Sequence, residues 1–140
     1  MTQMIAWFAI LCHIEEHVKS RVRAEVRQGY NNTDGVPDAE TIRIYRSDER
    51  DVNLWVRKNG SVTFAVDVWH GNDDPDPRIA NQALAELEEE LQAALATWPD
   101  AAAKDLKMKI TITIDGVTGD GENYRPMCAA FYRITVKWNK

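Results

Sequence analysis

The sequence predicts an α+β fold in which a mostly antiparallel β-sheet of about five strands carries two helices on one face. Apolar residues recur every three or four positions in two segments, and at every second position in the segments that separate and follow them. The predicted order of elements is therefore α-β-β-β-α-β-β. A chain of 140 residues is long enough to bury one core without disulfides or metal, so residues 1–140 are interpreted as a single domain.

The first helix is predicted over Met4–Arg27, and Gly29 follows closely enough to end it. The apolar run Ile5–Cys12 is far shorter than a membrane span and lacks a basic leader, so no membrane association is expected. The segment Gly29–Thr41 reads as a long loop of the kind that carries partner contacts. The buried stripe of the helix is predicted to comprise Met4, Trp7, Leu11, Ile14, Val18 and Val22.

Three short strands are predicted next, because the apolar period changes to two. They cover Ile42–Ile44, Val52–Val56 and Val62–Val68. Lys58-Asn59-Gly60-Ser61 joins the second and third, and Asn-Gly between alternating strands is a strong hairpin signal because both residues tolerate positive φ.

The second helix is predicted to begin with Asp76 as its cap and Pro77 in its first turn, and to stop at Pro99. Its glutamates at positions 86 and 88–90 are interpreted as a solvated face. Its buried stripe is predicted to comprise Leu84, Leu87, Leu91, Leu95 and Trp98.

Two longer strands close the chain, over Met108–Ile114 and Cys128–Trp138, with a polar, glycine-rich hairpin loop at Asp115–Asn123 between them. Their alternate positions are polar, with Lys109, Thr111 and Arg133 among them. We therefore expect both helices on one sheet face, and water or a neighbouring subunit on the other.

The formal charge of −5 argues against a protein that grips a nucleic-acid backbone, yet it suits a channel through which DNA passes without sticking. The two cysteines, Cys12 and Cys128, have no metal-ligand spacing. Free, buried thiols are the favoured interpretation, and a bridge between them remains open at this point.

One segment matches a catalytic motif. His13-Ile14-Glu15-Glu16-His17 fits the H-x-x-E-H pattern of inverted zinc proteases, in which two His hold the metal and the Glu handles the proton. Such enzymes also need a distant carboxylate ligand and a substrate cleft. We interpret His13, Glu16 and His17 as a solvated helix face, so no catalytic residue, metal site or cofactor is predicted.

Two acidic loops could suggest calcium, one with Asp73, Asp74 and Asp76 and the other with Asp115, Asp120 and Glu122. Neither has the ligand order of a calcium-binding loop, and turn formation and capping explain both. The sequence also lacks phosphate-cradling and serine-hydrolase motifs.

Of the five tryptophans, Trp7, Trp98 and Trp138 fall on predicted core stripes. Trp55 and Trp69 fall on otherwise polar strand faces, where a large ring must be covered by a partner or by packing at the sheet edge. The candidate subunit or partner contacts are accordingly Trp55, Trp69, Asp73, Asp74, Asp120 and Glu122.

The succession of elements resembles the tail terminator (tail completion, minor tail protein) family of long-tailed bacteriophages. The resemblance rests on the order helix, short strands, Asn-Gly hairpin, Phe64–Trp69, Asp/Pro-rich cap, leucine helix and two closing strands, and it covers Met4 to Trp138. It depends on size, element order and hydrophobic pattern rather than on an invariant motif.

The resemblance implies a non-enzymatic virion protein without cofactors, assembled in the cytoplasm of a bacterial host. It implies a homo-oligomeric ring, a hexamer, that caps the tail tube, ends its polymerisation and presents the surface for head attachment. Its partners would be the tail tube protein and a head-tail connector or neck protein, with DNA passing through unbound. The loops Gly29–Thr41 and Asp115–Asn123 would contact them.

Three alternatives remain open. Another head-tail joining or neck component would keep the structural role with a different partner. A small zinc-dependent hydrolase would use His13, Glu16 and His17. A ferredoxin-like regulatory domain would bind a small ligand.

Overall fold

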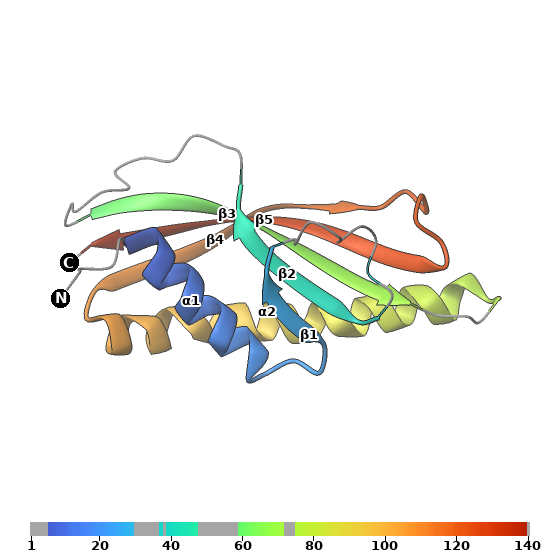
Figure 1. The fold of residues 1–140 in the computed structure, drawn as a ribbon, viewed down its shortest axis with the longest axis horizontal. Helices are drawn as coiled ribbons and strands as arrows, with labels where there is room; N and C mark the ends of the chain where they lie inside the picture. The colour runs from blue at the N-terminus through green and yellow to red at the C-terminus, as the bar shows by residue number, and fades with distance from the viewer. Residues whose placement is uncertain (1–5, 30–36, 38, 48–58, 72–74, 140) are drawn as a thin grey trace.

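The computed structural model describes residues 6–29, 37, 39–47, 59–71 and 75–139 of the chain (Figure 1). It confirms the predicted α+β fold and the order α-β-β-β-α-β-β. The elements are α1 (Ala6–Lys19), β1 (Glu25–Gln28), β2 (Thr41–Arg46), β3 (Asn59–Gly71), α2 (Pro77–Leu106), β4 (Lys109–Gly119) and β5 (Met127–Asn139).

The strands form one mixed sheet in the order β1-β2-β3-β5-β4. β1 pairs with β2 in parallel, and every other neighbouring pair is antiparallel. β3 and β5 are the long central strands, while β4 lies at one edge of the sheet (Figure 1).

Both helices pack on the same face of this sheet, as predicted. α1 lies against β1 and β2, whereas the longer α2 lies against β3, β4 and β5. The core between the layers is built from the predicted stripes of α2, including Leu87, Leu91 and Trp98, and from alternate strand residues such as Phe64 and Ile134, all of which are fully buried. No helix among the described residues has the length and apolar character needed to cross a membrane.

The predicted first helix is too long, because α1 ends at Lys19 and Glu25–Gln28 forms β1 instead. The last turn closes through backbone bonds from Arg21 N and Val22 N to Val18 O, each 3.0 Å. Pairing of β1 with β2 then buries Val26 in the core. The free energy gained by this non-local pairing exceeds the local preference for a helix that the spacing of Val22 and Val26 indicates.

The predicted Asn-Gly turn is also wrong, because Asn59 and Gly60 are the first residues of β3 and pair with Asn139 and Trp138 of β5. The predicted strand Val52–Val56 lies outside the described residues. Among the described residues, the strands between the helices are therefore β1, β2 and β3.

The start of α2 is as predicted: Asp76 is the N-cap, and its carboxylate accepts from Arg78 N at 3.0 Å. The predicted stop at Pro99 is wrong, since the helix continues to Leu106 and ends at Lys107 in the left-handed conformation. Pro99 lacks a backbone donor, but Trp98 and Ala102 on either side of it are fully buried, so packing against the sheet holds the helix together.

The last loop is shorter than predicted, because β4 runs on to Gly119. Asp115 occupies an irregularity between Ile114 and Gly116, where the register with β5 shifts by one residue. This bulge keeps Val117 on the same face as Ile114, because Val117 pairs with Tyr132 and Ile114 pairs with Ile134.

Candidate partner-contact surface at the β4–β5 end

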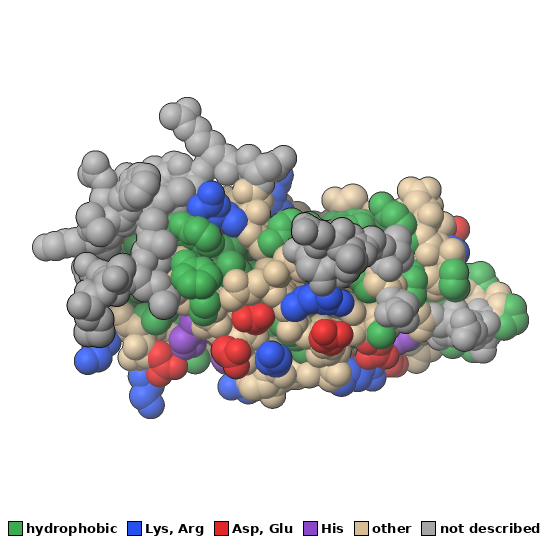
Figure 2. Space-filling model, in the orientation of Figure 1, with side chains coloured by type: hydrophobic (Ala, Val, Ile, Leu, Met, Phe, Trp, Pro, Cys, Tyr) green, Lys and Arg blue, Asp and Glu red, His purple; other side chains and the backbone are tan. Residues whose placement is uncertain are grey.

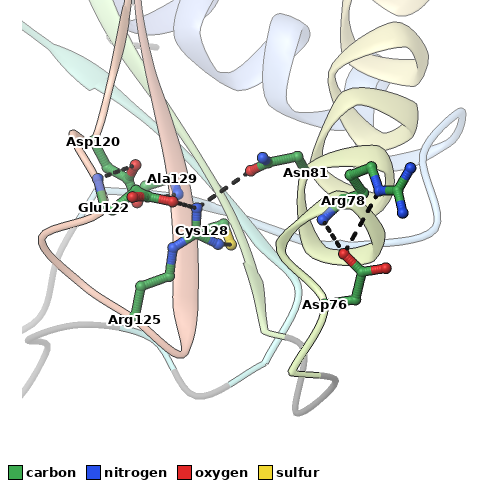
Figure 3. Close-up of polar contacts among 8 residues, drawn as sticks. All are labelled: Asp76, Arg78, Asn81, Asp120, Glu122, Arg125, Cys128 and Ala129. Atoms are coloured by element: carbon green, nitrogen blue, oxygen red, sulfur yellow. Dashed lines mark hydrogen bonds and ion pairs between the residues drawn. The ribbon is translucent and has the colours of Figure 1, made fainter.

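The loop between β4 and β5 is organised by the carboxylate of Asp120 (Figure 3). One oxygen, Oδ1, accepts from Glu122 N at 3.0 Å, and Oδ2 accepts from Ala129 N at 3.1 Å. Gly121 and Glu122 both have positive φ, at 62° and 61°, which tightens the turn. A single side chain thus ties the start of the loop to the first residues of β5.

Arg125 fastens the same loop to α2 (Figure 3). Its Nη2 donates to Glu122 Oε1 at 3.0 Å and to Asn81 Oδ1 of α2 at 3.2 Å, while Nη1 donates to Cys128 Sγ. Burial raises the pKa of the Cys128 thiol although the nearby guanidinium opposes the shift. The thiol is therefore a packed, protonated group, and both Cys12 and Cys128 are free cysteines.

Tyr124 of the loop packs over the sheet face opposite the helices. Its ring lies 5.2 Å from that of Trp69 and 6.4 Å from that of Phe131, both edge-on. Trp69 is only 3% exposed and shares a small cluster with Met127 and Ala129. Its ring is therefore covered within the chain, which agrees with the sheet-packing alternative and leaves no free ring face for a partner.

Three exposed apolar side chains belong to this loop and to the elements that flank it. Ile79 in the first turn of α2 is 44% exposed, Val117 of β4 is 48% exposed and Tyr124 is 39% exposed. Figure 2 shows hydrophobic side chains at the right-hand end of the molecule, where Figure 1 places the β4–β5 loop and the start of α2. We call the end of the molecule that carries these three residues the hairpin-end surface; Ile79 and Val117 lie on its helix-covered side, and Tyr124 lies on the opposite sheet face.

This surface has the anatomy of a protein contact site. Apolar groups are flanked by the charged side chains of Glu122 and Arg125, and contacts between proteins commonly have an apolar centre and a polar rim. The hydrogen bonds of Asp120 and Arg125 hold the loop in one conformation, so a partner would not have to order it on binding.

The predicted contact residues have different places in the structure. Asp120 and Glu122 lie at the hairpin-end surface, but both make hydrogen bonds within the loop. Trp55, Asp73 and Asp74 lie outside the described residues.

The acidic side chains near this loop do not converge on a common point. Asp115 accepts hydrogen bonds from Thr113 Oγ1, at 3.2 Å, and from Thr135 Oγ1. Asp120 binds backbone donors, and Glu122 binds Arg125. Within the described part of the chain, no three His, Cys, Asp or Glu side chains form a group able to hold a metal ion.

The H-x-x-E-H segment lies on α1, and its two histidines turn toward α2. His13 Nδ1 accepts from Trp98 Nε1 at 3.0 Å, and His13 Nε2 contacts Asp105 Oδ2 at 2.8 Å. The exposed Glu16 is not part of this arrangement. Both nitrogens of His13 are therefore engaged in holding the helices together, and the predicted solvated face is wrong for this residue.

His17 is buried at the same contact. Its Nε2 lies 3.1 Å from Ala94 O, 2.9 Å from Thr97 Oγ1 and 3.0 Å from Arg21 Nε. Burial, followed by the positive charge of Arg21, lowers the pKa of His17. This geometry favours a neutral ring that packs between two helices, so His17 also departs from the predicted solvated face.

Sequence reasoning missed Ile79, Tyr124 and Arg125. Tyr124 and Arg125 follow a glycine-rich turn, and an aromatic residue beside a cation in such a loop could have marked it as a contact segment. Ile79 carried no such signal, because its exposure depends on how far α2 extends beyond the sheet.

Comparison with protein-family models and with curated proteins finds no match for this chain. A functional assignment must therefore rest on the fold and on the surfaces described above.

Proposed function

We propose that this protein is a structural component of a phage or prophage tail, which caps the tail tube as an oligomeric ring, ends tube polymerisation and forms the head-attachment interface. The hairpin-end surface is the observation that carries this proposal. It presents Val117 near the end of β4 and Tyr124 on an ordered loop, and Arg125 of that loop binds Asn81 of α2, two residues after Ile79.

Two further features support the proposal. The order α-β-β-β-α-β-β is part of what the resemblance to tail terminators rests on, although Asn59 and Gly60, from its Asn-Gly hairpin, begin β3 instead. The net charge of −5 suits a ring through which DNA slides without binding. In this proposal the ring is a hexamer in the virion, and the hairpin-end surface faces either the tube protein or the connector.

The first test is the absolute mass of the purified protein, measured by light scattering over a concentration series. A mass of six chains, or growth toward that mass with concentration, is the expected result. A strict monomer that also fails to bind tail tubes would contradict the proposal.

The second test examines the surface itself, by co-sedimentation with tubes assembled from the tail tube protein of the same genome. Val117→Lys and Ile79→Lys place a charge at exposed apolar positions, so both are expected to lose tube binding while folding normally. Gln82→Lys, at an exposed polar position of α2, is the matched control. If all three variants bind tubes like the unmodified protein, the hairpin-end surface is not the contact.

Another neck component is the alternative that the same surface supports. A chain that binds a connector but not tubes would establish that role. The zinc-hydrolase alternative is not favoured, because His13 and His17 contact Trp98, Asp105, Ala94 and Thr97 of α2.

A further inference from the structure

β4 is an edge strand, and its outer side pairs with no other described strand. Among the described residues it pairs only with β5, and its positions 111 and 113–119 are exposed. The run Ile110-Thr111-Ile112-Thr113-Ile114 consists entirely of β-branched residues, which strongly favour strands. An edge of this kind, without proline, readily recruits another strand.

The sequence of β4 is self-complementary about Ile112. In an antiparallel pair of two β4 strands centred there, Lys109 faces Asp115, Ile110 faces Ile114 and Thr111 faces Thr113. Residues directly opposite each other in an antiparallel pair lie on the same face. Isoleucines would therefore meet on the helix-covered face, threonines on the other, and a Lys–Asp pair would form at each end.

We propose that β4 binds β4 of a second copy of this chain in that register, which joins the two five-stranded sheets across a two-fold axis. The contact is isologous, so the Lys109–Asp115 pair occurs twice. The exposed part of Ile114, 44% of its surface, is covered by Ile110 and its surroundings in the second copy. This inference does not depend on the proposed tail function.

The charges discriminate between this arrangement and its parallel counterpart. A parallel in-register pair would set Lys109 against Lys109 and Asp115 against Asp115, and like charges directly opposite are destabilising. Lys109 and Asp115 are both exposed. Asp115 accepts from two threonine hydroxyls, which leaves acceptor capacity on its carboxylate for an incoming ammonium group.

The test is charge reversal in the chain of residues 1–140. Sedimentation equilibrium measures the dissociation constant of the dimer for each variant. Lys109→Asp alone and Asp115→Lys alone each turn two attractive pairs into repulsive ones, so each is expected to weaken the dimer about tenfold. The double variant Lys109→Asp with Asp115→Lys restores both pairs and is expected to restore the dimer. A mixture of the two single variants is expected to form heterodimers, because every pair is then attractive.

A matched pair of substitutions tests the apolar part of the contact. Ile114→Lys lies inside the proposed register and is expected to abolish dimerisation. Thr118→Lys, at an exposed position of β4 outside both the register and the hairpin-end surface, is expected to leave the dimer unchanged. Circular dichroism checks that each variant is folded.

Three outcomes would overturn the inference: an unmodified protein that stays monomeric at all concentrations, single charge reversals without effect, or a double variant as weak as the singles. A hexamer insensitive to all the β4 substitutions would overturn the β4 contact and leave the proposed ring intact. A β4 dimer that never binds tail tubes would support the contact and contradict the tail function.

Discussion

Replacing Asp120 tests whether one carboxylate holds the hairpin-end surface in place. Asp120→Ala removes the acceptor of Ala129 N and that of Glu122 N. Ala129 is 1% exposed, so its N–H would be left without an acceptor, at a cost of about 1–3 kcal/mol. Glu122 is exposed and can bond to water, so it adds only about 0.5 kcal/mol. The free energy that holds the loop closed should therefore fall by about 1.5–3.5 kcal/mol.

Amide hydrogen exchange is the appropriate assay, because the loop can open without unfolding the sheet. The protection of the Ala129 amide is expected to drop by between about tenfold and about three-hundredfold in Asp120→Ala, since about 1.4 kcal/mol corresponds to a factor of ten. Asp120→Asn keeps one carbonyl acceptor and should give an intermediate loss. Unchanged exchange at Ala129 in both variants would refute the structural role of Asp120.

Three further predictions concern the core and the helix contact. Burial and a neighbouring guanidinium lower the folded-state pKa of His17, so its contribution to stability is complete above the ordinary value of 6.5 and is lost as the pH falls through the folded pKa. In His17→Gln, the urea concentration at the unfolding midpoint should therefore change less with pH below 6.5 than it does in the unmodified protein. Leu91→Ala, at a position with 0% exposure, should cost about 2–5 kcal/mol in urea unfolding, whereas Ile79→Ala should cost less than about 0.5 kcal/mol. Asp67 and Arg43 form a buried ion pair, with 3.8 Å between Asp67 Oδ2 and Arg43 Nη2. Asp67→Ala removes the carboxylate from the buried guanidinium and should lower the free energy of unfolding by about 3–5 kcal/mol. A melting temperature near that of the unmodified protein would contradict this prediction.

The part of the fold that could be predicted from the sequence is the part set by local periodicity. The buried stripe of α2 was predicted from its spacing, and the structure buries Leu87, Leu91, Leu95 and Trp98. A helix packed on a sheet buries the residues that the helical repeat places on the side facing the sheet. The strand faces of β3 and β5 were predicted for the same reason.

Errors arose where non-local packing decides the structure. β1 is only four residues long and exists through its pairing with β2, which no local pattern reveals. The continuation of α2 past Pro99 likewise depends on the burial of Ala102 beneath the sheet. A proline signal is local, whereas the packing energy that overrides it is not.

The candidate sites were predictable only in part, for a related reason. The family resemblance predicted partner contacts in the Asp115–Asn123 loop, but the hydrogen bonds of Asp120 to β5 could not be foreseen. The histidines of α1 had a recognisable spacing, yet their role depends on where α2 crosses α1. Spacing within one helix fixes which residues share a face, but only the packing of the second helix decides what that face contacts.

The two proposed surfaces have different symmetry, and this limits what each can do. A two-fold β4 contact uses the single β4 edge of each chain, so it closes after two copies and cannot by itself build a ring of six. The exposed apolar residues of the hairpin-end surface come from α2, β4 and a loop rather than from one edge strand, so this surface can make head-to-tail or partner contacts. A subunit with both surfaces could keep its β-branched edge covered before assembly while leaving Ile79 and Val117 accessible to the tail. The phenotypes of Ile114→Lys and Val117→Lys should accordingly separate: the first affects dimerisation, and the second affects tube binding.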